Sequence, residues 1–240
     1  MTSAYNHALQ IRYARLAGLM YLLVDATYLT FALITGRFRV SGDFAETAHR
    51  IAESELLYRI GQSSGLVASV CIVFLAIGLY VAVKPIDSHL ALLALLFRFL
   101  EATFVGGQAV LALVVSRLYV GADALNAFDE KQLSIFVTLH AAADQILFNS
   151  LGLFFGLGST LFFYLLFRSG YIPKLLAGWG LLGSVLVPMS CLGSLMWPEH
   201  GKMLQLGWAP IGLAEIVVGL WLVFKGVNIR VSTPAAPLPK

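Results

Sequence analysis

Long apolar runs separated by short polar stretches recur along the whole chain. A helix needs about 20 mostly apolar residues, at ~1.5 Å each, to cross a hydrocarbon core ~30 Å thick. Six runs meet this requirement: 16–35, 57–83, 89–116, 146–167, 175–197 and 206–224. The pattern therefore predicts an all-α fold, a polytopic transmembrane bundle of about six membrane-spanning helices.

The polar stretches between the runs are of two kinds. Residues 84–88 and 168–174 are short turns built around prolines, which end helices. The connections before the second and fourth spans are longer and richer in acids. In the first of these we expect a short polar helix over 46–53, outside the bilayer. In the second we expect Asp129 to cap an extension of the fourth span that begins in water.

The distribution of basic residues favours an orientation with both termini in the cytoplasm. In that orientation the inner side carries eight Lys and Arg residues and one acid, Asp87, whereas the outer side carries seven basic residues and eight acids. Because cytoplasmic loops are enriched in Lys and Arg, we predict an N-in, C-in topology. Four tryptophans lie at predicted helix ends, where such rings settle at the headgroup level: Trp179, Trp197, Trp208 and Trp221.

The chain is expected to form one transmembrane helical domain, residues 1–231, followed by a tail. Residues 232–240 contain three prolines and no apolar run. We expect them to be a disordered, proline-rich end that contributes nothing to folding. Deleting them should therefore leave thermal stability in detergent unchanged.

Composition excludes several classes of protein. The 240 residues are 59% hydrophobic and 12% charged, about half the charged fraction of soluble domains. The net charge of +3, with no basic cluster among aromatic residues, argues against a nucleic-acid partner. Cys71 and Cys191 lie in apolar runs, where we expect them to be packing residues. The chain shows no catalytic motif and no metal-ligand spacing, so the sequence predicts no catalytic residue, no metal and no cofactor.

Five ionisable residues fall inside or at the ends of the predicted spans: Asp25, Arg98, Glu101, Asp144 and Glu215. Each costs about 2.5 to 3.5 kcal/mol at the centre of a membrane helix, so such residues are expected to face each other or a wet cavity. Arg98 and Glu101 are three residues apart, share a helix face and could form an in-helix pair. His140 lies four residues before Asp144 and shares its face in the same way.

One arginine against four carboxylates would give this set a formal charge of −3 if all were ionised. We therefore expect one or more of Glu101, Glu215 and Asp25 to be protonated at neutral pH. An in-helix pair leaves most of the five guanidinium donors unmet. For that reason we also expect a carboxylate from another helix, Glu215 or Asp144, beside Arg98.

These residues predict a polar pocket between the helices, open toward the outer side. We expect six side chains to bind its ligand: Arg98, Glu101, Glu215, Asp25, Asp144 and His140. The alternative is a polar network between helices that only fixes their packing, with Asp144 and His140 wetted at the membrane surface.

Three stretches of sequence carry a resemblance to a known family. They are Phe-Arg-Phe-Leu-Glu-Ala at 97–102, Phe-Arg-Ser-Gly-Tyr-Ile-Pro-Lys at 167–174 and Arg-Leu-Ala-Gly-Leu-Met-Tyr-Leu at 15–22. Over most of its length the chain resembles the bacterial multi-pass membrane proteins catalogued as number 4386 among the domains of unknown function. The resemblance implies a protein of the bacterial cytoplasmic (inner) membrane. It implies no particular activity, because none is established for the family.

Three functions fit these features. We favour the binding or transport of a small polar or cationic ligand, with proton-coupled transport as one form of this function. The first alternative is a membrane partner or sensor subunit without chemistry of its own. The second is an intramembrane enzyme acting on a lipid, with His140 as base and Asp144 as the acid that orients it. The expected partners are membrane lipids and a small polar ligand or proton, and the sequence leaves the oligomeric state open.

Overall fold

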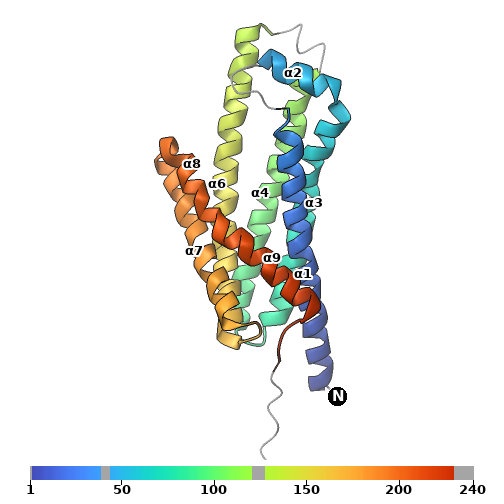
Figure 1. Ribbon diagram of the computed structural model, residues 1–240, viewed down its shortest axis with the longest axis vertical. Coiled ribbons are helices and arrows are strands. Elements are labelled where there is room, and N and C mark those ends of the chain that lie inside the picture. Colours follow the sequence, from blue (N-terminus) through green and yellow to red (C-terminus); the bar gives the residue numbers. More distant parts are fainter. Residues whose placement is uncertain (1, 39–43, 121–127, 230–240) are drawn as a thin grey trace, which may run out of the picture.

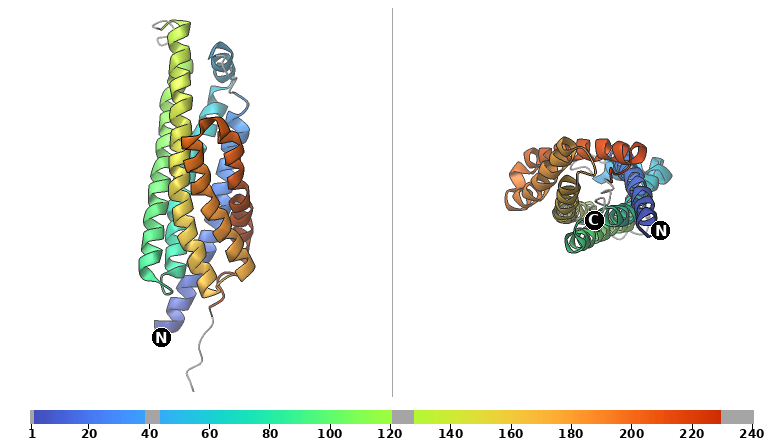
Figure 2. Two further views of the ribbon diagram at one scale, coloured as in Figure 1. Left: turned by 90° about the vertical axis from the view of Figure 1, so that its left-hand side faces the viewer. Right: turned by 90° about the horizontal axis from the view of Figure 1, so that it is seen from below.

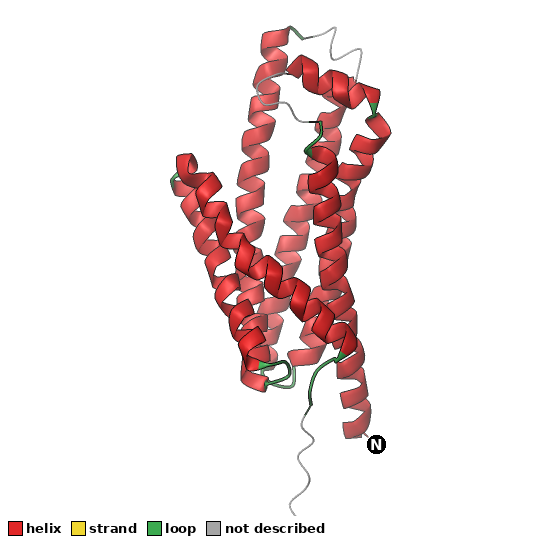
Figure 3. Ribbon diagram, viewed as in Figure 1, coloured by secondary structure: helices red, strands yellow, loops and turns green. Residues whose placement is uncertain are grey.

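The computed structural model describes residues 2–38, 44–120 and 128–229; the predicted tail, 232–240, lies outside them. Over the described residues the chain is a bundle of helices without strands (Figure 3). The long helices are α1 (Thr2–Thr35), α3 (Glu55–Val83), α4 (Ser88–Val120), α6 (Glu130–Ser169), α7 (Lys174–Met196) and α9 (Ala209–Phe224). The shorter elements are α2 (Phe44–Glu53), η1 (Pro198–His200), α8 (Gly201–Leu204) and η2 (Gln205–Trp208). Within the described ranges six helices are long and apolar enough to span a membrane, which confirms the predicted multi-pass bundle.

The six long helices form a closed ring (Figures 1 and 2). Each packs against the next long helix along the chain, and α9 crosses diagonally from α7 to α1 to close the ring. Within the described part of the chain, no Cα atom of α9 lies within 8 Å of a Cα atom of α3, α4 or α6. The last span therefore joins the first and the fifth without packing its backbone against the other three.

α6 is far longer than the apolar run that predicted it. Its 40 residues span about 60 Å at ~1.5 Å per residue, twice the thickness of a hydrocarbon core. The Asp129 carboxylate accepts a hydrogen bond from the backbone N–H of Gln132 at 2.8 Å, and the Gln132 side chain accepts one from the N–H of Asp129 at 3.0 Å. This reciprocal cap satisfies donors of the first turn. The predicted cap and the extension of the fourth span are both confirmed.

The short polar helix predicted before the second span is present as α2. Its sequence is amphipathic, and its apolar face buries Ala48 and Ile51. These two side chains belong to a small cluster with Phe38, Tyr58 and Tyr119. α2 therefore covers the end of the bundle at which α1 ends and α3 begins (Figure 1).

The opposite end of the ring is held by polar contacts close to the turns. The side-chain amide of Gln10 on α1 donates to the carbonyl oxygen of Ala82 on α3 at 2.9 Å. The backbone N–H of Asn228, after α9, donates to the carbonyl oxygen of Tyr171 at 2.9 Å. The chain after α9 is thereby tied to the turn between α6 and α7, where Gly170 has the positive φ of 68° that favours glycine.

Trp208 packs inside the bundle at the start of α9. Its ring lies against Phe148 and Phe155 of α6, with centroid distances of 5.2 Å to both. A Cβ atom built on Gly152 would clash with the Trp208 ring, so the glycine makes room for the indole. Trp208 therefore packs the start of α9 against α6 through side chains.

Candidate functional site

Arg98 and Glu101 form a buried pair within α4, as predicted. Nη1 of Arg98 lies 3.0 Å from Oε2 of Glu101, and the side chains are only 1% and 2% exposed. The same Nη1 donates a hydrogen bond to Oγ of Ser159 on α6 at 3.1 Å. The guanidinium carbon lies 5.0 Å from the centre of the Phe155 ring, in a cation–π arrangement. Arg98 is thus held by its own helix and by α6.

Two further carboxylates approach this pair. Glu215 on α9 is buried, and Asp25 on α1 is half-buried. Both lie within electrostatic range of Arg98. Four of the six predicted site residues therefore gather in one part of the bundle, which we call the buried cluster: Asp25, Arg98, Glu101 and Glu215.

The prediction that Glu215 or Asp144 pairs directly with Arg98 is wrong. Among the described residues, Glu101 is the one carboxylate within 4.0 Å of the guanidinium. The partner from another helix is the Ser159 hydroxyl. The physical reason is the packing of the ring, since α4 lies against α6 whereas the backbone of α9 stays more than 8 Å from that of α4.

Each member of the buried cluster has unmet hydrogen-bonding capacity. Nε of Arg98, Oε1 of Glu215 and Oδ2 of Asp25 are buried without a hydrogen-bond partner among the described groups, and Oε2 of Glu101 has the ion pair with Arg98 but no hydrogen bond. Buried polar atoms are normally paired, and exceptions concentrate where a protein binds ions, water or protons. The cluster therefore has the donors and acceptors that a proton or a small polar species needs.

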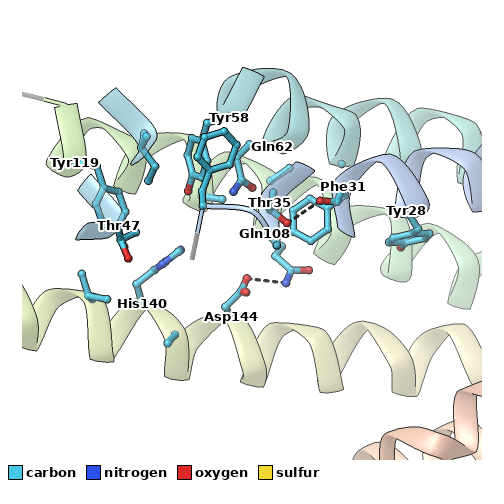
Figure 4. A pocket seen from close by; sticks show the side chains of 18 of the residues that line it. Tyr28, Phe31, Thr35, Thr47, Tyr58, Gln62, Gln108, Tyr119, His140 and Asp144 are labelled. Carbon is cyan, nitrogen blue, oxygen red and sulfur yellow. Dashed lines mark hydrogen bonds between the residues drawn. The ribbon is translucent and has the colours of Figure 1, made fainter. Parts of the chain in front are cut away.

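A pocket of about 410 Å³ lies nearer the α2 end of the bundle (Figure 4). Residues of α1, α2, α3, α4 and α6 line it, and no described residue of α9 does. Its walls combine aromatic rings with hydroxyl and amide groups; the labelled side chains of Figure 4 are Tyr28, Phe31, Thr35, Thr47, Tyr58, Gln62, Gln108, Tyr119, His140 and Asp144. In the predicted N-in topology this end of the bundle faces the outer side.

Asp144 and His140 share one face of α6 and point into the pocket, as their spacing predicted (Figure 4). Oδ1 of Asp144 accepts a hydrogen bond from Nε2 of Gln108 on α4 at 2.7 Å. This bond orients the carboxylate across the pocket. The remaining two predicted site residues are therefore separate from the buried cluster and belong to the pocket wall.

The pocket and the buried cluster adjoin each other. Tyr28 lines the pocket and lies within electrostatic range of Glu101 and Arg98. On α4, Val105 of the pocket wall is one helical turn from Glu101. The inner end of the pocket thus reaches the level of the cluster.

Several pocket residues were not predicted from sequence. Tyr28, Tyr58 and Tyr119 are aromatic residues in or beside apolar runs, where they look like ordinary membrane-helix residues. Gln62 carried a usable signal, since an amide inside a long apolar run has to face a polar partner or a cavity.

Comparison with known proteins identifies the family. The family model described as "Domain of unknown function (DUF4386)" matches residues 16–226, which is most of the chain and includes five spans in full and the greater part of the first. Searches among curated proteins and among solved structures found no match. The match covers both the buried cluster and the pocket, and the chain is accordingly a member of the DUF4386 family of multi-pass membrane proteins.

Proposed function

We propose that this protein binds a small polar or cationic ligand in the pocket, from the outer side of a bacterial cytoplasmic membrane, and that the buried cluster carries protons linked to that binding. The observation that supports this most is the junction of the two sites at Tyr28 and Val105. A pocket that ends beside buried carboxylates can couple its occupancy to their protonation, because a charge at either place changes the field at the other.

The pocket wall suits an organic cation. Asp144 supplies a carboxylate that Gln108 holds in place. The rings of Tyr28, Tyr58 and Tyr119 supply the electron-rich faces that bind quaternary ammonium groups. Hydroxyl and amide groups among the lining residues give a polar ligand further hydrogen-bond partners.

The buried cluster suits proton movement. The cluster contains three carboxyl groups and one guanidinium, in a part of the protein that is shielded from bulk water. Each carboxylate comes from a different helix, namely α1, α4 and α9. A proton that moves between them would change the interactions among these helices, two of which also line the pocket.

Binding can be tested with tetramethylammonium chloride, using sodium chloride at the same ionic strength as the reference. A ligand at one hundred times its Kd adds about 2.7 kcal/mol to stability, so the melting temperature in detergent should rise. Asp144→Asn keeps an acceptor for Gln108 but removes the charge, and it should abolish the rise. Glu199→Gln, an exposed outer-side carboxylate away from the pocket, is the matched control and should keep it. Equal rises in wild type and Asp144→Asn would overturn the assignment of the pocket.

Proton coupling can be tested in proteoliposomes with a pH-sensitive dye inside. A tetramethylammonium gradient should move protons through the wild-type protein. Glu215→Gln should stop that movement while leaving the thermal shift caused by tetramethylammonium intact, because Glu215 does not line the pocket. Proton movement at the wild-type rate in Glu215→Gln would remove the buried cluster from the proposal.

A further inference from the structure

We infer that the ligand is an amphiphile dissolved in the outer leaflet, which enters the pocket sideways between α1 and α6 and leaves its apolar chain in that gap. The inference rests on the proposed function, because it names the class of ligand and its route to the same pocket.

The first observation is that α1 and α6 do not pack against each other where they line the pocket. α1 and α6 both line the pocket, yet within the described residues no Cα atom of one lies within 8 Å of a Cα atom of the other. The other walls are closed by helices that pack on each other, α1 on α3, α3 on α4 and α4 on α6. α9, which closes the ring lower down between α7 and α1, contributes no described residue to the pocket wall (Figure 1).

The second observation is the depth of the pocket. Ala68, at its inner end, is fifteen residues from the end of α3 at Val83, which corresponds to about 22 Å along the helix. Val105 is seventeen residues from the start of α4 at Ser88, or about 26 Å. Both distances are shorter than a hydrocarbon core of ~30 Å. The inner end of the pocket therefore lies at the depth of the outer leaflet.

The third observation is the outer surface of the two helices that border the gap. Leu29 and Leu33 on α1 are 60% and 58% exposed, and Leu139 and Ile146 on α6 are 61% and 56% exposed. The polar pocket residues of α6, such as Asp144, lie on the opposite face of the same helix turns. Polar groups inside and apolar groups outside are typical of helices surrounded by lipid. The outward faces of α1 and α6 are therefore apolar on both sides of the gap.

Together these features fit a molecule with a polar head and an apolar chain. The head would lie among Asp144, Gln108 and the tyrosines, where it exchanges its interfacial water for hydrogen bonds and aromatic faces. The chain would stay in the gap between α1 and α6, in contact with the leaflet from which it came. A solute arriving from water through the outer end would need no such gap.

The test is photocrosslinking in phosphatidylcholine vesicles, because this lipid carries a quaternary ammonium head. Benzoylphenylalanine replaces Phe31, a pocket residue of α1, in one variant. The positive control carries it at Phe74, which is 49% exposed on α3, and the negative control at Phe162, which is fully buried. We expect a lipid adduct at Phe31 and Phe74 but not at Phe162.

A second substitution links the adduct to the gap. Ala141→Phe places a ring on the α6 wall of the pocket and should lower the adduct at Phe31 several-fold, with the adduct at Phe74 unchanged. No adduct at Phe31, or an adduct that Ala141→Phe does not lower, would overturn lateral entry. The tetramethylammonium shift, measured on the same preparations, reports separately on the pocket. A shift that persists without a lipid adduct would leave the proposed function standing and remove only the lateral route.

Discussion

Gly158 on α6 lies directly against the side-chain stem of Arg98 on α4. A Cβ atom built on Gly158 would come 3.0 Å from both Cγ and Cδ of Arg98, and 3.2 Å from the carbonyl oxygen of Ala94. The absence of a side chain at this position lets the arginine lie between the two helices and reach Ser159, the next residue of α6.

Replacing Gly158 with alanine should therefore destabilise the protein. The added methyl group overpacks a buried site whose neighbours include backbone, and overpacking typically costs about 1 to 3 kcal/mol. The measurement is thermal unfolding in detergent. Gly212→Ala on α9 is the control, since a Cβ atom there would meet nothing within 4 Å, and it should not lower the melting temperature. An unchanged melting temperature for Gly158→Ala would mean that Arg98 can shift aside without loss.

The pairing of Arg98 can be measured with double mutants. Arg98→Leu should cost about 3 to 5 kcal/mol, because it strands the charge of Glu101 in the bundle. Combining it with Glu101→Leu should recover part of the loss, since the two side chains lie 3.0 Å apart. Combining it with Glu215→Leu should recover less, because that carboxylate lies beyond ion-pair distance. Equal recovery from both would contradict the geometry of the cluster.

The crossing of α1 and α9 should depend on its two glycines to different degrees. A Cβ atom on Gly18 would lie 2.7 Å from the carbonyl oxygen of Gly219 and 2.8 Å from the backbone nitrogen of Val223. A Cβ atom on Gly219 would come no closer than 3.1 Å to any neighbour. Gly18→Ala should therefore lower the melting temperature more than Gly219→Ala does, because backbone atoms cannot move aside as side chains can. The reverse order would show that α9 adjusts its position on α1.

The N-in, C-in topology predicts the result of reporter fusions. A reporter placed after Lys84 or Arg168 should signal cytoplasm, because both residues belong to the turns on the side of the N-terminus (Figure 1). A reporter placed after Asp43 or Asp123 should signal the outer side. A cytoplasmic signal at Asp123 would invert the orientation and would place the pocket on the inner side.

The sequence alone predicts those features of the fold and the site that depend on a single helix. Apolar run length is a local property, so the six spans were found, and the cap at Asp129 depends only on residues of the same turn. The shared faces of Arg98 with Glu101, and of His140 with Asp144, follow from helical spacing alone. Each of these relationships is present in the structure.

The relationships between helices were harder to predict. Whether Arg98 meets Ser159 or Glu215 depends on how close α4 comes to α6 and to α9, and a single sequence contains no measure of either distance. The division of the six charged and polar residues into a buried cluster and a pocket wall has the same origin. α6 rises well beyond the level of α9 (Figure 1). Asp144 belongs to the pocket wall, to which no described residue of α9 contributes.

The order in which the ring closes has a consequence for how the protein is made. α9 leaves the ribosome after the other five spans, and among the described helices it is the one that packs on both α1 and α7. Until it arrives, the first five spans form an open arc in the bilayer, and the buried cluster lacks Glu215. A chain truncated before Ala209 would keep that arc open and would leave Arg98 with Glu101 and Asp25 as its carboxylates.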